Sequence, residues 1–502
     1  MNLYHIEDPM LQFGSGSHVD NKFGLITHGP FDLNEARRPE KIVIGVVGSP
    51  QTISGVIGWF EKIEAGVVAK ASKKPNLFPA YPGLLEGSPF RCKLVFEKSL
   101  QDSLVPRDYV GVASIPEGEA RLRALAEVFI KRAKNLKDKG ADIVVVALPV
   151  EIFPLLGEEI EDEEDEDDPE PGLAAVELPL EPAPELSVKE EDKRPTRAVH
   201  FHDVLKAAAM QAEVPIQIVR PSTYDEKLKR KETDRYGRRR RLQDPATRAW
   251  NIMAAIYYKA DGIPWRIPRR DDDLHTCYLG ISFYEALDER TLQTSIAQVF
   301  DERGSGVILK GGTATRSKDD RQVHLDNDAI KDLIDRALKA YSDEHHHGPA
   351  GLIVHKTSTF NATEQNGVNS AADAAGVKHV DMVSIAQCFI RLFRDGYYPP
   401  LRGTTLDLTP EQTLLYTRGT SPFYEEYPGL YVPKSLKLRF DSITSSKIEL
   451  LETALVLTKM NWNNTQMDEL FPVTIRGARE VGAILKHVPK GGKIEAHYKY
   501  YM

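Results

Sequence analysis

The chain has 502 residues, of which 41% are hydrophobic and 28% charged, so it is long enough to bury the cores of two or more domains. It has no charged-then-apolar leader and no stretch near the ~18 apolar residues of a membrane span, which favours a soluble cytoplasmic protein without membrane contact. Three cysteines lie far apart without a C-x-x-C pair, which argues against a disulfide framework or a thiolate zinc site: Cys92, Cys277 and Cys388.

The net charge of −9 is spread unevenly along the chain. Residues 158–170, EEIEDEEDEDDPE, carry eleven acidic side chains and no basic one, so the remainder of the chain is weakly positive. Residues from about 157 to 195 are rich in Glu and Pro and poor in aromatic residues, which predicts a disordered acidic insertion. This insertion is either a solvated surface segment or a competitor of nucleic acid for a basic groove.

The first half of the chain has the pattern of an α/β domain. Apolar runs at 41–48 and 142–149 predict buried strands, and apolar residues at helical spacing between 117 and 140 predict a helix. A further helix at 201–213 and a strand at 214–219 follow. Alternating helices and strands predict a doubly wound, Rossmann-like lobe over residues 1–265.

A basic block follows that lobe's last predicted strand. Residues 227–241, KLKRKETDRYGRRRR, hold nine Lys or Arg side chains and two acidic ones. Such a block is either a solvated loop or a contact to nucleic-acid phosphates. The candidate phosphate contacts are Lys227, Lys229, Arg230, Lys231, Arg238, Arg239, Arg240 and Arg241.

Residues 266–502 predict a second α/β lobe. Strand-like runs occur at 276–284, 305–312, 351–358 and 379–385, with helical patterns at 324–341 and 366–377. In YLGISFY (278–284) alternation places Ser282 on the face opposite Leu279 and Ile281. The adjacent histidines at 345–347 cannot all converge on one ion, so we expect them in a loop that ends a helix.

Four polar residues in the first half form a candidate anion pocket. His202 and Lys206 lie one turn apart on the predicted helix at 201–213, Gln217 is on the next strand, and Lys259 ends a later helix. Two cations and an amide brought together by an α/β fold would bind a phosphate. From spacing alone, they can equally be four unrelated surface residues.

These positions carry a resemblance to a known family. The spacing H-x-x-x-K, the following Gln and the sequence KADGIPW resemble the MID domain of prokaryotic Argonautes, where such residues grip the 5′ end of a guide strand. The second half resembles a PIWI domain, which has an RNase H-like fold. The stretches that carry this likeness are YLGISFY, LIVHKTSTF, PLRGT, LLYTRGT and LVLTKMNWNNTQMDELFPVTIRGA.

The resemblance also indicates what the chain lacks. Active PIWI domains hold two divalent cations about 3.5–4 Å apart with carboxylates on adjacent strands and on the last helix. At the matching positions this chain has Ser282, Thr357 and Arg479. Hydroxyls are weak neutral ligands and an arginine repels Mg²⁺, so the resemblance implies a PIWI domain without catalytic residues.

The resemblance further implies a cofactor and partners. Argonautes commonly place their terminal carboxylate near the guide's 5′ phosphate, so the carboxylate of Met502 would help to hold a Mg²⁺ ion with the guide phosphates. The chain has no room for N and PAZ domains and resembles a short prokaryotic Argonaute. Such proteins act with an APAZ-domain partner that carries a nuclease, TIR or sirtuin-like effector. This implies a sensor in a defence complex, which binds a guide, expected to be RNA, and pairs it with invading single-stranded DNA.

Two other functions stay open from the sequence. The chain is alternatively a guided nuclease that uses other acids, such as Asp326, Asp328 or Asp381, or a structural subunit that holds the effector and binds no guide.

Overall fold

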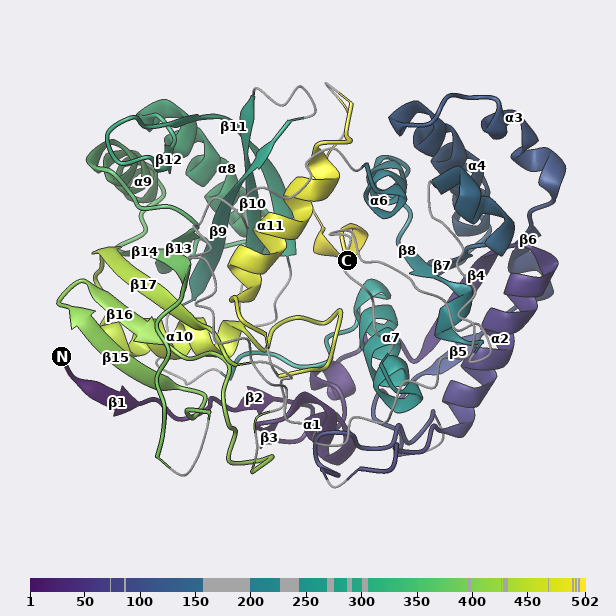
Figure 1. Cartoon of the computed structure of the whole chain (residues 1–502), viewed down its shortest axis with the longest axis horizontal. Helices are drawn as coiled ribbons and strands as arrows, with labels where there is room; N and C mark the ends of the chain where they lie inside the picture. The colour runs from purple at the N-terminus through teal and green to yellow at the C-terminus, as the bar shows by residue number, and fades with distance from the viewer. Residues whose placement is uncertain are drawn as a thin grey trace, which may run out of the picture.

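The computed structural model describes residues 1–72, 74–84, 87–156, 199–225, 243–268, 275–286, 291–299, 306–395, 399–425, 427, 432–467, 469–489, 492, 494 and 497–502. The acidic insertion and the whole basic block at 227–241 lie outside these residues. The described residues form two lobes side by side, each built on one sheet (Figure 1). None of the described helices is long and apolar enough to cross a membrane.

The smaller lobe is built on a parallel sheet of order β5-β4-β7-β8, with β6 also paired to β4. Its strands are β4 (Lys41–Gly48), β5 (Lys93–Val95), β6 (Gln101–Ser103), β7 (Ile143–Ala147) and β8 (Ile216–Val219). Residues of β7 point alternately into two separate cores, so all five are buried. Burial on both faces explains why the strand is a continuous apolar run.

Helices cover both faces of this sheet. α4 (Glu119–Asp138) and α6 (Phe201–Gln211) pack on one face. α2 (Pro50–Ala65) and α7 (Pro245–Lys259) pack on the other. A one-turn helix, α3 (Val110–Ala113), precedes α4. The predicted doubly wound, Rossmann-like lobe is confirmed.

The larger lobe is built on a ten-stranded mixed sheet. β9 (Thr276–Glu285), β10 (Leu292–Val299) and β11 (Gly306–Arg316) form an antiparallel meander, and β13 (Gly351–Lys356) and β14 (His379–Cys388) run parallel to β9. The spatial order β11-β10-β9-β13-β14 with these directions is that of an RNase H-like fold. The sheet is completed by β17 (Ser435–Ser442), β16 (Gln412–Leu415), β15 (Thr404–Thr409), β12 (Val323–His324) and β1 (Leu3–His5).

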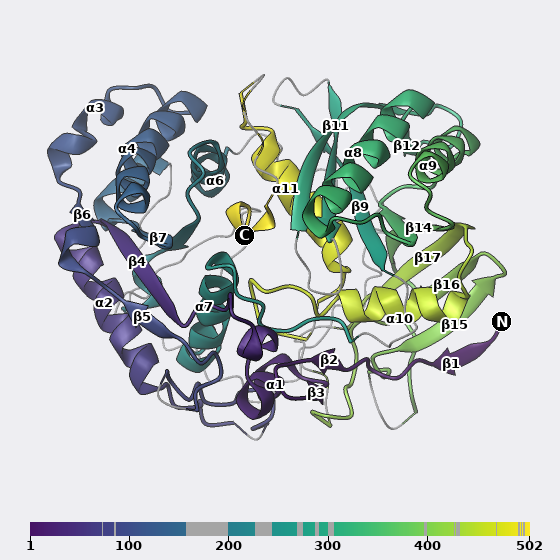
Figure 2. The same ribbon diagram turned by 180° about the vertical axis from the view of Figure 1, so that it is seen from behind.

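Four helices cover the two faces of the larger sheet. α8 (Asn327–His345) and α9 (Ala362–Ala374) bury one face of β9, β13 and β14, and α8 is seen in front of the sheet in Figure 2. On the other face α10 (Lys447–Leu457) packs on β17, and α11 (Val473–Leu485) runs along β9 (Figure 1). α8 ends at His345, and His346 follows in the left-handed conformation, so the three histidines do form the predicted helix end.

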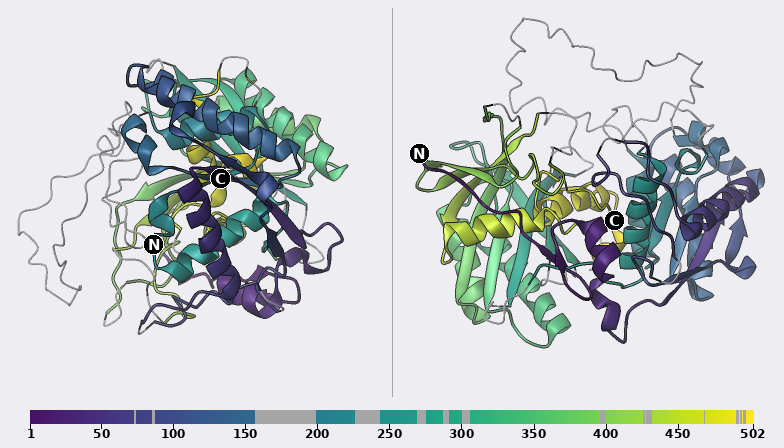
Figure 3. Two further views of the ribbon diagram at one scale, coloured as in Figure 1. Left: turned by 90° about the vertical axis from the view of Figure 1, so that its right-hand side faces the viewer. Right: turned by 90° about the horizontal axis from the view of Figure 1, so that it is seen from below.

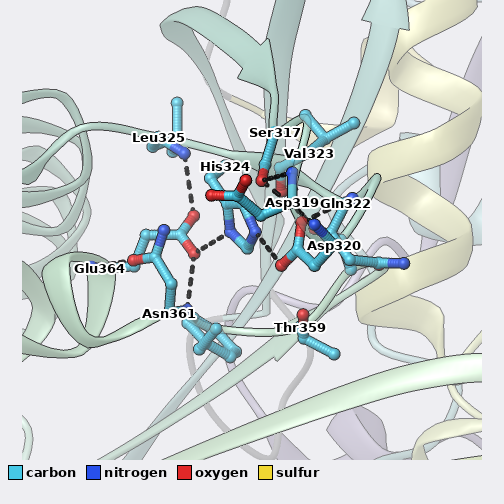
Figure 4. Close-up of polar contacts among 12 residues, drawn as sticks. Ser317, Asp319, Asp320, Gln322, Val323, His324, Leu325, Thr359, Asn361 and Glu364 are labelled. Atoms are coloured by element: carbon cyan, nitrogen blue, oxygen red, sulfur yellow. Dashed lines mark hydrogen bonds and ion pairs between the residues drawn. The ribbon is translucent and has the colours of Figure 1, made fainter.

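A buried polar network fixes the corner between β12, α9 and β13 (Figure 4). Glu364, at the start of α9, accepts hydrogen bonds from Lys356 Nζ at 2.6 Å and from the main-chain nitrogen of Leu325 at 2.9 Å. The His324 ring lies between Glu364 and Asp320, 2.8 Å from each carboxylate. The carboxylate of Glu364 thus joins three elements, which holds the end of β13 in place.

The N-terminal segment links the two lobes. β1 pairs with β15 at the edge of the larger sheet, and the chain then passes through β2 (Leu11–Gln12), β3 (Ser17–His18) and α1 (Asn21–His28) (Figures 1 and 3). Asp8, which lies between β1 and β2 in the chain, is paired with Arg402 Nε at 2.9 Å and with Lys459 Nζ at 2.7 Å. The predicted lobe of residues 1–265 therefore begins with a strand that belongs to the larger sheet.

Candidate functional site

The predicted pocket residues lie where the two lobes meet. Lys206 and Lys259 are 2% and 1% exposed, at the middle of α6 and the end of α7. Lys206 Nζ donates to the main-chain oxygen of Ile216 at 3.0 Å and to the main-chain oxygen of Met502, the last residue. Lys259 Nζ donates to Gln217 Oε1 at 2.6 Å. Four of the five predicted residues are thus in one cluster.

The fifth residue, His202, lies at the rim of this cluster. Its side chain is 49% exposed, and its Nδ1 atom is 3.0 Å from Oδ1 of the neighbouring Asp203. His202 precedes Lys206 by one helical turn, as the spacing predicts, but it does not share the burial of the two lysines.

The two lysines also hydrogen-bond each other, a contact that sequence spacing did not reveal. Burial lowers the pKa of Lys206 from its ordinary 10.5 to about 7. Burial lowers the pKa of Lys259 well below its ordinary value, and the neighbouring charge of Lys206 lowers it further. Burial therefore disfavours a charge on either lysine, and a bound anion would favour protonation of both.

Ser282 and Thr357 lie next to each other, as predicted. β13 pairs in parallel with β9 so that Lys356 is opposite Ile281, and the main-chain nitrogen of Thr357 donates to the Ile281 oxygen at 3.1 Å. Ser282 is 4% exposed. We call these two adjacent positions the Ser282–Thr357 row.

α11 covers β9 at close range beside this row. A Cβ atom on Gly280 would lie 2.0 Å from the main-chain oxygen of Thr474, so only glycine permits this approach. Arg479 is on the exposed side of α11, with its guanidinium 5.0 Å from the Phe471 ring centroid. The third predicted position is therefore on the helix that packs against the row.

The polar side chains near the Ser282–Thr357 row do not resemble a metal-ion site. His355, one residue before Lys356, is fully buried and donates to or accepts from Thr474 Oγ1 at 2.8 Å. Burial lowers its pKa to about 4, so the ring is neutral at pH 7. Within the described ranges, no group of three or more His, Cys, Asp or Glu side chains is arranged to hold a metal ion.

The three acids of the alternative nuclease hypothesis make contacts that support the fold. Asp381 accepts hydrogen bonds from the main-chain nitrogens of Thr444 and Ser445, at 2.6 and 2.9 Å. Asp326 caps the N-terminus of α8 by accepting from Ala329, and Asp328 is exposed in the first turn of that helix. These three acids therefore do not form one carboxylate cluster.

Solved structures with the same fold identify its type. No protein-family model and no curated protein sequence matches the chain. Among solved structures, the chain is similar to the Argonaute of Clostridium butyricum bound to a guide DNA and a 19-mer target DNA, with a TM-score of 0.61 and 15% identity over 98% of this chain and 53% of that one. Drosophila Piwi gives 0.59, with 10% identity over 100% of this chain and 56% of that one.

A third similar structure is the Argonaute of Marinitoga piezophila in complex with a 5′ OH guide RNA and target DNA. Its TM-score is 0.54, with 12% identity over 96% of this chain and 57% of that one. The fold is that of an Argonaute MID–PIWI pair. The smaller lobe corresponds to MID and the larger to PIWI, and the chain spans about half the length of these Argonautes.

The buried lysine pair makes a pH-dependent contribution to the stability of this MID–PIWI fold. Because the pKa of Lys206 is lowered from 10.5 to about 7, the unfolded chain binds more protons than the folded chain between these values. The free energy of unfolding contributed by this group therefore rises with pH across that window. We expect Lys206→Met to raise the free energy of unfolding by on the order of 4 kcal/mol at pH 7 and by little near pH 10.

The measurement is the urea unfolding midpoint of the wild type and of Lys206→Met at several pH values from 6.5 to 9.5. Lys331→Met is the control, because Lys331 forms a half-exposed pair with Asp335 on α8. A difference between wild type and Lys206→Met that is constant with pH would contradict the prediction.

Proposed function

We propose that the chain is the guide-binding subunit of an Argonaute-type complex and that the cluster of Lys206, Gln217, Lys259 and Met502 holds the 5′ end of the guide. One observation carries this proposal. Among the described residues, neither buried lysine has a side-chain carboxylate as a partner; both donate only to main-chain and amide oxygens or to each other. A carboxylate at Met502 would balance at most one of the two ammonium charges, and a guide phosphate would supply the remaining negative charge.

The same cluster fits a role for Mg²⁺ in guide binding. Met502 is 6% exposed, and its main-chain oxygen accepts a hydrogen bond from Lys206. Mg²⁺ prefers oxygen ligands and is usually held by one or two carboxylates together with phosphates. A carboxylate at Met502 and the phosphates of the guide would hold the ion between them, and the ion would neutralise their mutual repulsion. The ion's role here is binding, not catalysis.

We propose that this subunit pairs an RNA guide with single-stranded DNA and does not cut it. The Ser282–Thr357 row offers two hydroxyls, and the third matching position, on α11, is Arg479 in place of a carboxylate. Two-metal cleavage requires carboxylates that hold the ions in place. Hydroxyls bind divalent cations weakly, so the row lacks the chemistry to hold a metal pair.

We further propose that an APAZ-domain partner with a nuclease, TIR or sirtuin-like effector completes the complex in the cytoplasm, as an antiviral or anti-plasmid defence. The chain spans 53–57% of the length of the similar Argonautes, so half of their structure has no counterpart in it. A duplex of ~20 base pairs is a rod about 50–60 Å long with dense negative charge. A second protein would supply the missing part of its channel.

The pocket predicts a dependence on the guide's 5′ phosphate. Lys206→Ala with Lys259→Ala removes two charge-assisted contacts of about 1.5–3 kcal/mol each, and the loss should be less than additive because the two groups touch. We expect 5′-phosphorylated guides to lose at least tenfold more affinity than 5′-hydroxyl guides. Binding of both guides is measured with Lys331→Ala as the control. Equal losses for the two guides would make the lysines an ordinary backbone contact.

The Ser282–Thr357 row predicts that the isolated chain does not cleave. The purified chain is incubated with guide and matched labelled DNA in Mg²⁺ and in Mn²⁺, and the products are separated on a denaturing gel. We expect intact target in both. Guide-dependent product that persists through repurification and disappears in a guide-binding variant would identify a nuclease instead.

The partner proposal predicts a complex whose effector responds to the target. The chain is co-expressed with the protein encoded beside it, and the mass of the purified material and the effector output are measured with guide alone and with guide plus target DNA. We expect one complex with output only when the target is present. Two separate proteins, or output that ignores the target, would exclude a sensor role.

A further inference from the structure

Four large apolar side chains are exposed together where β14 ends and β17 begins. Phe389, Ile390 and Phe393 follow β14 and are 51%, 42% and 76% exposed, and Val432, just before β17, is 51% exposed. Cys388 is paired with Ser435, so the two segments lie side by side. We call these four residues the β14–β17 surface. Several large exposed apolar side chains on neighbouring segments are typical of an interaction site.

Hydrogen bonds from buried side chains hold the backbone of this surface in place. The hydroxyl of Tyr416, a fully buried residue, donates to the Ile390 oxygen at 3.2 Å and accepts from the Leu392 nitrogen at 2.7 Å. Ser435 Oγ also donates to the Ile390 oxygen, at 3.2 Å. The phenyl rings are thus presented by a segment that is already ordered, so binding to them costs little conformational entropy.

The two segments that carry the rings contain more basic than acidic residues. Residues 388–395 and 432–441 contain five Lys or Arg and two Asp. Lys434 Nζ is 5.9 Å from the Phe389 ring centroid, and one of the two acids, Asp441, is paired with Arg439 at 3.0 Å. The two segments therefore combine exposed aromatic rings with an excess of positive charge, since Arg391, Arg394, Lys434 and Lys437 outnumber the remaining acid, Asp395.

The surface also lies at the same edge of the sheet as the Ser282–Thr357 row. β9, β13 and β14 are parallel, so their carboxyl ends meet at one edge. Thr357 follows the last residue of β13, and Phe389 follows the last residue of β14, which extends four residues beyond the position paired with Lys356. A strand that passes the row toward this edge would meet the β14–β17 surface next.

We propose that the β14–β17 surface binds an unpaired segment of nucleic acid, with bases stacked on Phe389 and Phe393 and phosphates near the surrounding cations. This rests on the proposed function, because it takes the strand from a guide–target complex. Single strands are bound without sequence preference by aromatic platforms within a positive surface. The excess of positive charge favours a polyanion over an apolar protein segment as the occupant.

The test uses the full chain loaded with a 5′-phosphorylated guide and two matched DNA targets. Both targets have ten-nucleotide unpaired tails at each end; in one the tails carry bases, and in the other they are abasic. We expect the wild type to bind the target with bases about five- to a hundredfold more tightly, the range for stacking of a single base. Phe389→Ala with Phe393→Ala should abolish this preference, whereas Ile448→Ala, at an exposed apolar site on α10, should retain it.

A second variant separates stacking from apolar contact. Phe389→Leu with Phe393→Leu keeps apolar side chains but removes the rings, so it should also lose the preference. Retained preference in the leucine variant, or no preference in the wild type, would overturn the proposal. So would variants that keep the preference but lose a co-purified protein. If the wild type does not load a guide, the proposed function fails first, and the two tails are then compared as free oligonucleotides.

Discussion

The cost of burying a lysine ammonium is the constraint that organises this structure. Lys206, Lys259, Lys356 and Lys459 are each no more than 2% exposed. Lys356 is paired with Glu364 at 2.6 Å and Lys459 with Asp8 at 2.7 Å, so each has a carboxylate in contact. The same cost falls on Lys206 and Lys259, which donate to main-chain and amide oxygens. The sites of Lys356 and Lys459 resemble structural ion pairs. The site of Lys206 and Lys259 is suited to a ligand that brings its own negative charge.

The structural pairs explain why certain short stretches of the sequence carry the family likeness. Arg402 of PLRGT and Lys459 of LVLTKMNW both contact Asp8 from distant parts of the chain. Burial would raise the pKa of Asp8, but the two cations outweigh it and hold that pKa below its usual range. Arg402 also donates to the oxygen of Leu455 and to Thr458 Oγ1, at the end of α10. Replacing either cation would leave a buried charge without a full partner, so the motif residues are tied to the fold.

The sequence predicted those parts of the fold whose signal is local. The apolar run of β4 has the predicted bounds, and the alternation in β9 correctly separates Ile281 from Ser282, because each strand's burial follows from its own residues. β10 and β15 to β17 were not predicted; four of the eight residues of β10, LQTSIAQV, are polar, so it lacks the continuous apolar run of a buried central strand. The pairing of β1 with β15 joins residues about 400 positions apart, which no local pattern indicates.

The candidate pocket was likewise predicted from the sequence only in part. Helical spacing placed His202 and Lys206 on one face of α6, but spacing alone could not show that one is half exposed and the other buried. The contact between Lys206 and Met502 spans nearly 300 residues and was reached only through the family resemblance. The hydrogen bond between Lys206 and Lys259 had no signal in the sequence, because two like charges are not expected to touch until burial has removed a proton from one of them.

The packing of α11 connects the pocket to the Ser282–Thr357 row. Its first turn lies against Gly280 so closely that a side chain there would collide with the Thr474 oxygen, and its second half faces Tyr284 at Gly482. α11 also contacts α6, and the segment that follows it leads to Met502 at Lys206. Each of these two contacts involves a glycine, Gly280 on the strand and Gly482 on the helix, so the helix lies close to the strand. α11 therefore links the row to the pocket through its packing on β9 at one end and the chain that leads to Met502 at the other.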